Sequence, residues 1–304
     1  SWIPVGLPPD PDETVAVAPV ESLAAVLADV RRVNTDLARM RELQMQVSEQ
    51  LDAQAGQDAL SEELREAADF LRWCEAGNFT VLGYARYDAD GAPRESLGVL
   101  HDREGDRAPA PDAGPVLAIG QAALPVSVHR SSYPSFVGVR AAGVEHRLVA
   151  VFTPAGRHEN VLDIPGAGRR VRALLDRAGF DIDSFSGQAV LQVVQALPLT
   201  ELFAASPDSL HSALTEVAGI TAREHIHLFL RTDVPGDSMS ALVFIPRDRY
   251  NTRTRLAAQR VLLDELNGTA VEYTTNVSEY PLAMVHFTMR VPADTTVTDT
   301  RRLD

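Results

Sequence analysis

The sequence predicts an α+β protein: two mixed α/β modules joined by helices, with a long helix on the N-terminal side. Three observations support this prediction. Apolar residues recur every three or four positions over 20–51, short strand-like runs fill 79–152, and a helical stretch then leads into a second set of strand-like runs. With 304 residues, of which 45% are hydrophobic, the chain is long enough to bury two cores.

Residues 1–19 are rich in proline and acidic residues, which predicts an extended linker from a preceding domain. From Val20 the apolar residues follow a near-heptad that Gln44 interrupts, so residues 20–56 are expected to form one long amphipathic helix. Such a helix is longer than most helices of compact domains. Two interpretations stay open: the helix pairs with a partner helix, or it packs on the core of its own domain.

Residues 57–160 are expected to form the first α/β module. A helix over 61–75 precedes Gly77, a residue type that commonly ends helices. Strands follow, and an Asp90-Gly91 turn makes the first two of them a hairpin. The predicted strands are 79–87, 95–101, 116–119, 126–129, 136–140 and 147–152.

A helical connector is expected over 161–205, followed by the second module over 206–292 and an unstructured tail over 293–304. The order of elements in this module is helix, strand, strand, helix, strand, strand. That is the order of a ferredoxin-like domain after a cyclic shift, with both helices expected on one face of the sheet. The predicted helices are 167–178, 184–196, 208–217 (with Ser206 as N-cap) and 252–266, and the predicted strands are 225–232, 239–246, 270–276 and 284–291.

The composition excludes several functions. The 28 basic residues are all arginine, they face 42 acidic residues, and the net charge of −14 opposes nucleic acid as a partner. Without lysine the chain has neither the phosphate-binding lysine of a Walker loop nor an amine for Schiff-base chemistry. A single cysteine indicates a reducing compartment, naturally the cytoplasm, and no apolar run suggests membrane insertion or a signal peptide.

Other possible sites are better explained by structure. Gly166 and Gly168 precede a helix as in a dinucleotide fingerprint, but the third glycine is missing, so a loop into a helix is the better interpretation. His225 and His227 share a strand face and could bind a metal if His286 or an acid joined them, yet two ligands do not make a site. A half-exposed sheet face or an interface between subunits explains them better. Cys74 lies on an apolar helix face, which indicates a buried structural thiol.

Three segments together carry a resemblance to a known family: Trp73 to Tyr87 (WCEAGNFTVLGYARY), Val128 to Val139 (VHRSSYPSFVGV) and Phe229 to Thr252. They resemble the N-terminal region of the large bacterial NAD-specific glutamate dehydrogenases. The heptapeptide PRDRYNT, Pro246 to Thr252, is the most specific part. Residues 164–170 and 197–204 depart from the family's pattern, which weakens the transfer of specific contacts there.

The resemblance implies a PAS-like fold for the first module and an ACT-like fold for the second, with NAD and the catalytic domain located downstream. It also implies a homo-oligomer and an amino acid as a possible effector. We therefore expect a non-catalytic regulatory or oligomerisation segment that holds no catalytic, cofactor or metal residue. A purely structural oligomerisation arm and a stand-alone amino-acid sensor remain alternatives. The regulatory or interface candidates are His129, Arg130, His225, His227, Arg231, Arg247, Arg249 and Tyr250.

Overall fold

The structure is a computed structural model, and it describes residues 20–56, 60–101, 114–122, 134–219, 226–232, 238–277, 281–292 and 295. The predicted linker 1–19, the predicted strand 126–129 and the predicted tail apart from residue 295 lie outside the described residues. Within the described part, no helix is long and apolar enough to cross a membrane.

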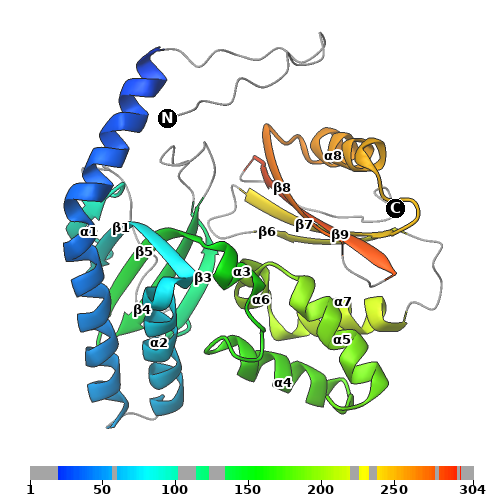
Figure 1. The fold of residues 1–304 in the computed structure, drawn as a ribbon, viewed down its shortest axis with the longest axis horizontal. Helices are drawn as coiled ribbons and strands as arrows, with labels where there is room; N and C mark the ends of the chain where they lie inside the picture. The colour runs from blue at the N-terminus through cyan, green and yellow to red at the C-terminus, as the bar shows by residue number, and fades with distance from the viewer. Residues whose placement is uncertain are drawn as a thin grey trace.

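The long predicted helix is present as α1, Val20–Ala55, and lies antiparallel to α2, Ser61–Trp73 (Figure 1). From Val33 onward one stripe of α1 is buried against α2 and the first sheet. Gln44, which interrupts the apolar pattern, is itself buried and donates a hydrogen bond of 2.7 Å to the carbonyl of Leu71. The C-terminal two thirds of α1 therefore pack on their own domain, one of the two predicted alternatives.

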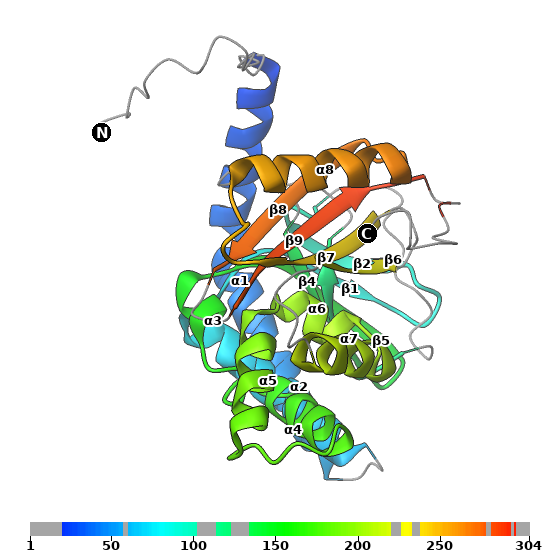
Figure 2. The ribbon, with the colours of Figure 1, turned by 90° about the vertical axis from the view of Figure 1, so that its right-hand side faces the viewer.

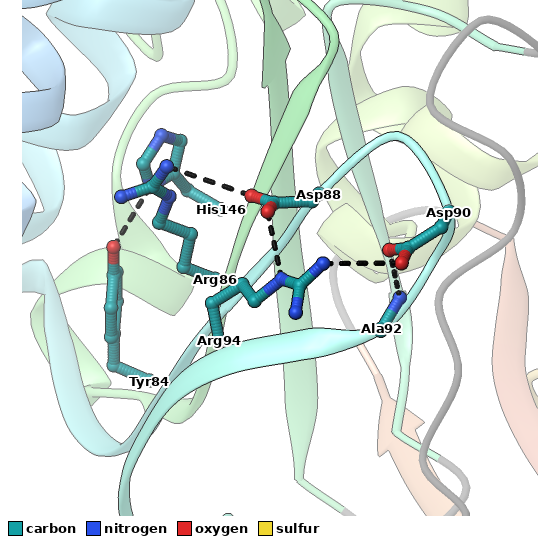
Figure 3. Close-up of polar contacts among 7 residues, drawn as sticks. All are labelled: Tyr84, Arg86, Asp88, Asp90, Ala92, Arg94 and His146. Carbon is teal, nitrogen blue, oxygen red and sulfur yellow. Dashed lines mark hydrogen bonds and ion pairs between the residues drawn. The ribbon is translucent and has the colours of Figure 1, made fainter.

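The first sheet is antiparallel with the strand order β2-β1-β5-β4-β3. A π-helical turn, Cys74–Asn78, leads from α2 into it, and Gly77 adopts a φ of 98° that favours glycine. The β1–β2 turn is held by Arg94, which donates to Asp88 and Asp90 (Figure 3). Beside it, Tyr84 and His146 are hydrogen-bonded to each other. The strands are β1 Phe79–Tyr87, β2 Pro93–Gly98, β3 Leu117–Gln121, β4 Ser135–Ala141 and β5 Val144–Phe152.

Helices fill the chain between the sheets. Ser184 and Ser206 act as N-caps, since their hydroxyls accept hydrogen bonds from the backbone of Gly187 and Ser209. Two short helices in this stretch, α3 and α6, are absent from the sequence prediction. The helices are α3 Pro154–His158, α4 Ala167–Arg177, α5 Phe185–Ala196, α6 Leu199–Ala204 and α7 Pro207–Gly219.

The second sheet has the antiparallel order β6-β7-β9-β8, built from β6 His227–Thr232, β7 Ser238–Pro246, β8 Ala270–Asn276 and β9 Leu282–Arg290. The helix α8, Thr252–Leu266, joins β7 to β8. The amide side chain of Asn251 caps its first turn, and Asn267 ends it with a left-handed φ of 50°.

The prediction that both helices of this module cover one face of the sheet is wrong. Leu262 and Leu266 of α8 pack on one face, whereas α6 and α7 lie against the other (Figures 1 and 2). The reason is that both faces of β7 and β9 are apolar: Val243 and Val285 face α8, while residues such as Phe244 and Met284 join the core of the preceding helices. The second sheet is thus a middle layer between two helical layers.

Candidate functional site at the junction of helix α6 and the second sheet

The predicted candidates do not form one site. His129, Arg130 and His225 lie outside the described residues. Arg247, Arg249 and Tyr250 follow β7 at the end opposite to Ser240, and the hydroxyl of Tyr250 donates to Thr275 at 3.2 Å. His227 and Arg231 lie on β6, and both contact the helices beneath the sheet.

The face of β6 that carries His227, Phe229 and Arg231 is turned toward the helices, because side chains on a strand alternate between its two faces. Phe229 packs on the helical core, and the imidazole Nδ1 of His227 lies 3.0 Å from a carboxylate oxygen of Glu216 on α7. This face is therefore an interface inside the chain.

Arg231 makes a two-point contact across this interface. Its guanidinium donates to both carboxylate oxygens of Glu201, at 2.7 and 3.1 Å, in a fork geometry. The Nε2 of His286 lies 3.3 Å from the same carboxylate and 3.0 Å from the hydroxyl of Ser240. Glu201 comes from α6, and its partners Arg231 and His286 come from β6 and β9. Ser240 of β7 joins the cluster through His286.

This cluster is buried. Glu201 is 4% exposed, and Ser240 and His286 are 2% and 8% exposed. Burial alone would raise the pKa of Glu201, but the hydrogen bonds and charges of His286 and Arg231 outweigh it and lower that pKa to about 2. Glu201 is therefore ionised at neutral pH.

Helix α6 also contacts the first module. It lies against β3, and the ring of Phe203 meets that of Phe70 on α2 edge-on at 5.7 Å. Glu201 thus contacts the second sheet and Phe203 the first module, so α6 bridges the two modules.

The polar side chains of Glu201, Arg231, Ser240 and His286 are paired with one another. Among the residues that the structure describes, no group of three or more His, Cys, Asp or Glu side chains could hold a metal ion. Cys74 is buried, as predicted, and burial raises the pKa of its thiol, which disfavours the reactive thiolate.

Sequence reasoning named Arg231 but missed Glu201 and Ser240. A signal for α6 exists: Leu199, Leu202 and Phe203 follow helical spacing after Pro198, with one acidic residue among them. An isolated acid within an apolar run needs a cation, although the run does not say which one.

The fold and the cluster together define a two-module protein in which a helical segment is tied to an α/β sheet domain. Residues 164–223 match the family model of helical motif 1 of glutamate dehydrogenase, and residues 227–304 match the model of its ACT2 domain.

Curated relatives agree with these matches. NAD-specific glutamate dehydrogenases of Mycobacterium tuberculosis and Halomonas elongata are 35% and 30% identical over 96% and 93% of this chain. That of Pseudomonas aeruginosa is 34% identical over 76% of it. The chain belongs to the family of the large NAD-specific glutamate dehydrogenases. It spans only 16–19% of the length of these relatives.

Proposed function

We propose that this chain is the non-catalytic regulatory and assembly segment of an NAD-dependent glutamate dehydrogenase. The complete enzyme converts L-glutamate, NAD and water into 2-oxoglutarate, ammonium, NADH and a proton, with its catalytic domain and NAD site outside this chain. It works as a cytoplasmic homo-oligomer. Residues 57–160 form a PAS-like domain, 161–205 a helical connector and 206–292 an ACT-like domain.

The observation that carries this proposal is the partial coverage of the relatives: the chain matches less than a fifth of three enzymes, and the matched models are an ACT domain and a helical motif. The buried fork between Glu201 and Arg231 supports it, because it ties α6 of the connector to the second sheet, and α6 also contacts the first module through Phe203. Such a link can transmit a ligand's effect from one module to the next.

The test compares the complete enzyme carrying Glu201→Gln with a control carrying Glu62→Gln, an exposed position on α2. We measure NAD reduction by L-glutamate while titrating free amino acids. We expect Glu201→Gln to keep turnover but to change the effector concentration at half-response by roughly fivefold or more, a coupling of about 1 kcal/mol. Identical effector curves for both variants would contradict the proposed regulatory role. Turnover of glutamate by the 304-residue chain alone would contradict the proposal that this chain is non-catalytic.

A purely structural arm is the second candidate, favoured by one observation. In the N-terminal third of α1, the apolar side chain of Leu27 is 49% exposed. If α1 pairs with another copy here, Leu27→Glu lowers the oligomer mass in sedimentation equilibrium. Leu256→Glu on α8, at an equally exposed leucine, is the matched control and leaves the mass unchanged.

A further inference from the structure

A pocket of about 470 Å³ lies between the first module and the helical segment. Glu63 and Glu66 of α2 form one side of it, and Leu117 of β3 with Phe203 of α6 contributes to the apolar part. Its volume falls within the range of small-molecule sites. The other lining residues are Pro115, Val116, Gly166, Arg169, Arg170, Ala173, Leu174, Arg177, Pro207 and Leu210.

One whole face of α4 lines this pocket. Arg169, Arg170, Ala173, Leu174 and Arg177 follow one another by one or three positions, which is the spacing of a single helix face. The N-terminal end of α4 lies at the pocket, since Gly166, Arg169 and Arg170 line it. The first turn of the helix holds no acidic residue that would balance the partial positive charge of a helix N-terminus.

The three arginines that line the pocket differ in whether they have a carboxylate partner. Arg169 donates in a fork to Glu66 at 2.6 to 2.8 Å, and Arg177 pairs with Asp208 at 2.6 Å. Arg170 instead stacks over the ring of Phe203 at 5.1 Å and has no ion pair among the described residues. It is half-buried, and burial followed by the charge of Arg169 lowers its pKa.

Glu63 is the acidic counterpart of Arg170. It lines the same pocket, its charge acts on Arg170, and no described residue forms an ion pair with it. Of the charged side chains that line the pocket, Arg170 and Glu63 are thus the cation and the anion with no ion pair among the described residues. The pocket also has an apolar wall, in which Val116, Leu174 and Leu210 are each less than 9% exposed.

We propose that this pocket binds a free α-amino acid with an apolar side chain. The carboxylate of the ligand accepts hydrogen bonds from Arg170, its ammonium group is held by Glu63, and its side chain lies against Leu117, Phe203 and their apolar neighbours. Other classes fit less well. A polyphosphate would be repelled by Glu63 and Glu66, and a neutral apolar molecule would leave Arg170 desolvated without a partner.

The proposal deepens the regulatory role proposed above, because the bound ligand would touch α2, α4, α6 and α7 at once. It can be tested without enzyme turnover. We titrate the 304-residue chain with L-leucine and L-phenylalanine in a calorimeter, and with two analogues that each lack one charge: 4-methylpentanoate has no ammonium group and 3-methylbutylamine has no carboxylate.

We expect saturable binding of at least one amino acid, and binding of both analogues weakened at least about tenfold, which is 1.4 kcal/mol. Arg170→Gln and Glu63→Gln should weaken it to a similar extent. Arg172→Gln, an exposed arginine of the same helix that does not line the pocket, should leave it unchanged. Ala173→Leu fills the pocket from an exposed position, so it tests the site without removing an existing contact.

The proposal would be overturned if neither amino acid binds, or if binding persists unchanged in Arg170→Gln and Ala173→Leu. Equal affinity for 4-methylpentanoate would overturn the assignment of Glu63. None of these binding measurements uses glutamate or NAD. A failure of the pocket proposal is therefore distinguished from a failure of the proposed enzyme function, which is tested by the turnover of the complete protein.

Discussion

At the scale of single side chains, Glu201 is a carboxylate that is both nearly fully buried and ionised at neutral pH. Its removal would leave Arg231, whose side chain is 21% exposed, without the carboxylate that its fork contacts. We predict that Glu201→Ala lowers the free energy of unfolding by roughly 3 kcal/mol, as for other broken buried ion pairs. Urea denaturation at pH 7 measures the loss.

The matched control for Glu201 is Glu216→Ala, which breaks the contact to His227. The Glu216 side chain is 52% exposed, so its loss should cost less than about 1 kcal/mol. Equal losses in the two variants would contradict the view that Glu201 is held by a buried fork.

His146 gives the protein a pH dependence of its own. Burial, with a contribution from Arg86, lowers its pKa from 6.5 to about 4 in the folded state. Between these values the unfolded chain binds more protons, so the free energy of unfolding falls as the pH drops from about 6.5 to 4. Glu201 adds its own loss only from 4.5 down to about 2.

We therefore predict that the wild type loses roughly 2 kcal/mol of stability between pH 7 and pH 5 through His146. His146→Gln keeps a polar partner for Tyr84, with which His146 is hydrogen-bonded at 2.8 Å, but does not titrate. Urea midpoints at the two pH values should then differ less for the variant. An unchanged pH slope would show that His146 is not the responsible group.

At the scale of elements, α4 depends on a glycine inside its first turn. A Cβ at Gly168 would lie 2.3 Å from the carbonyl oxygen of Leu162, closer than real atoms approach. We predict that Gly168→Ala destabilises the protein by about 1–3 kcal/mol, as overpacking does, although alanine is the better helix former. Thermal unfolding measures this.

The reverse exchange on the same helix is the control. Ala173 is exposed, so Ala173→Gly should cost about 1 kcal/mol through helix propensity alone. If the protein with alanine were the more stable one at both position 168 and position 173, the close approach of Gly168 to Leu162 would not matter for stability.

The elements with strong local signals were predictable from sequence. Helix α8 has its predicted bounds, since Asn251 and Asn267 mark its two ends, and β8 also matches. Helix α6 was missed because six residues after a proline give less than two turns of periodicity. The fork to Arg231 could not be predicted for a related reason: its partner is 30 positions away, and a buried acid does not identify its cation.

At the scale of the whole molecule, α6 links both modules, so they should unfold together. We predict one calorimetric transition for the wild type with equal calorimetric and van't Hoff enthalpies. Glu201→Ala weakens the link to the second sheet and should broaden or split that transition. A wild-type chain with two separate transitions would contradict the coupling through α6.

Trp73 has a practical consequence for such work. Its ring lies 5.4 Å from Phe70 and 6.2 Å from Phe152, and the only other tryptophan in the sequence is Trp2. The second sheet contains no tryptophan, so the emission of Trp73 in a Trp2→Phe background is an optical probe of the first module alone. A blue-shifted spectrum that persists after circular dichroism has registered the loss of the second sheet would reveal an intermediate with one module still folded.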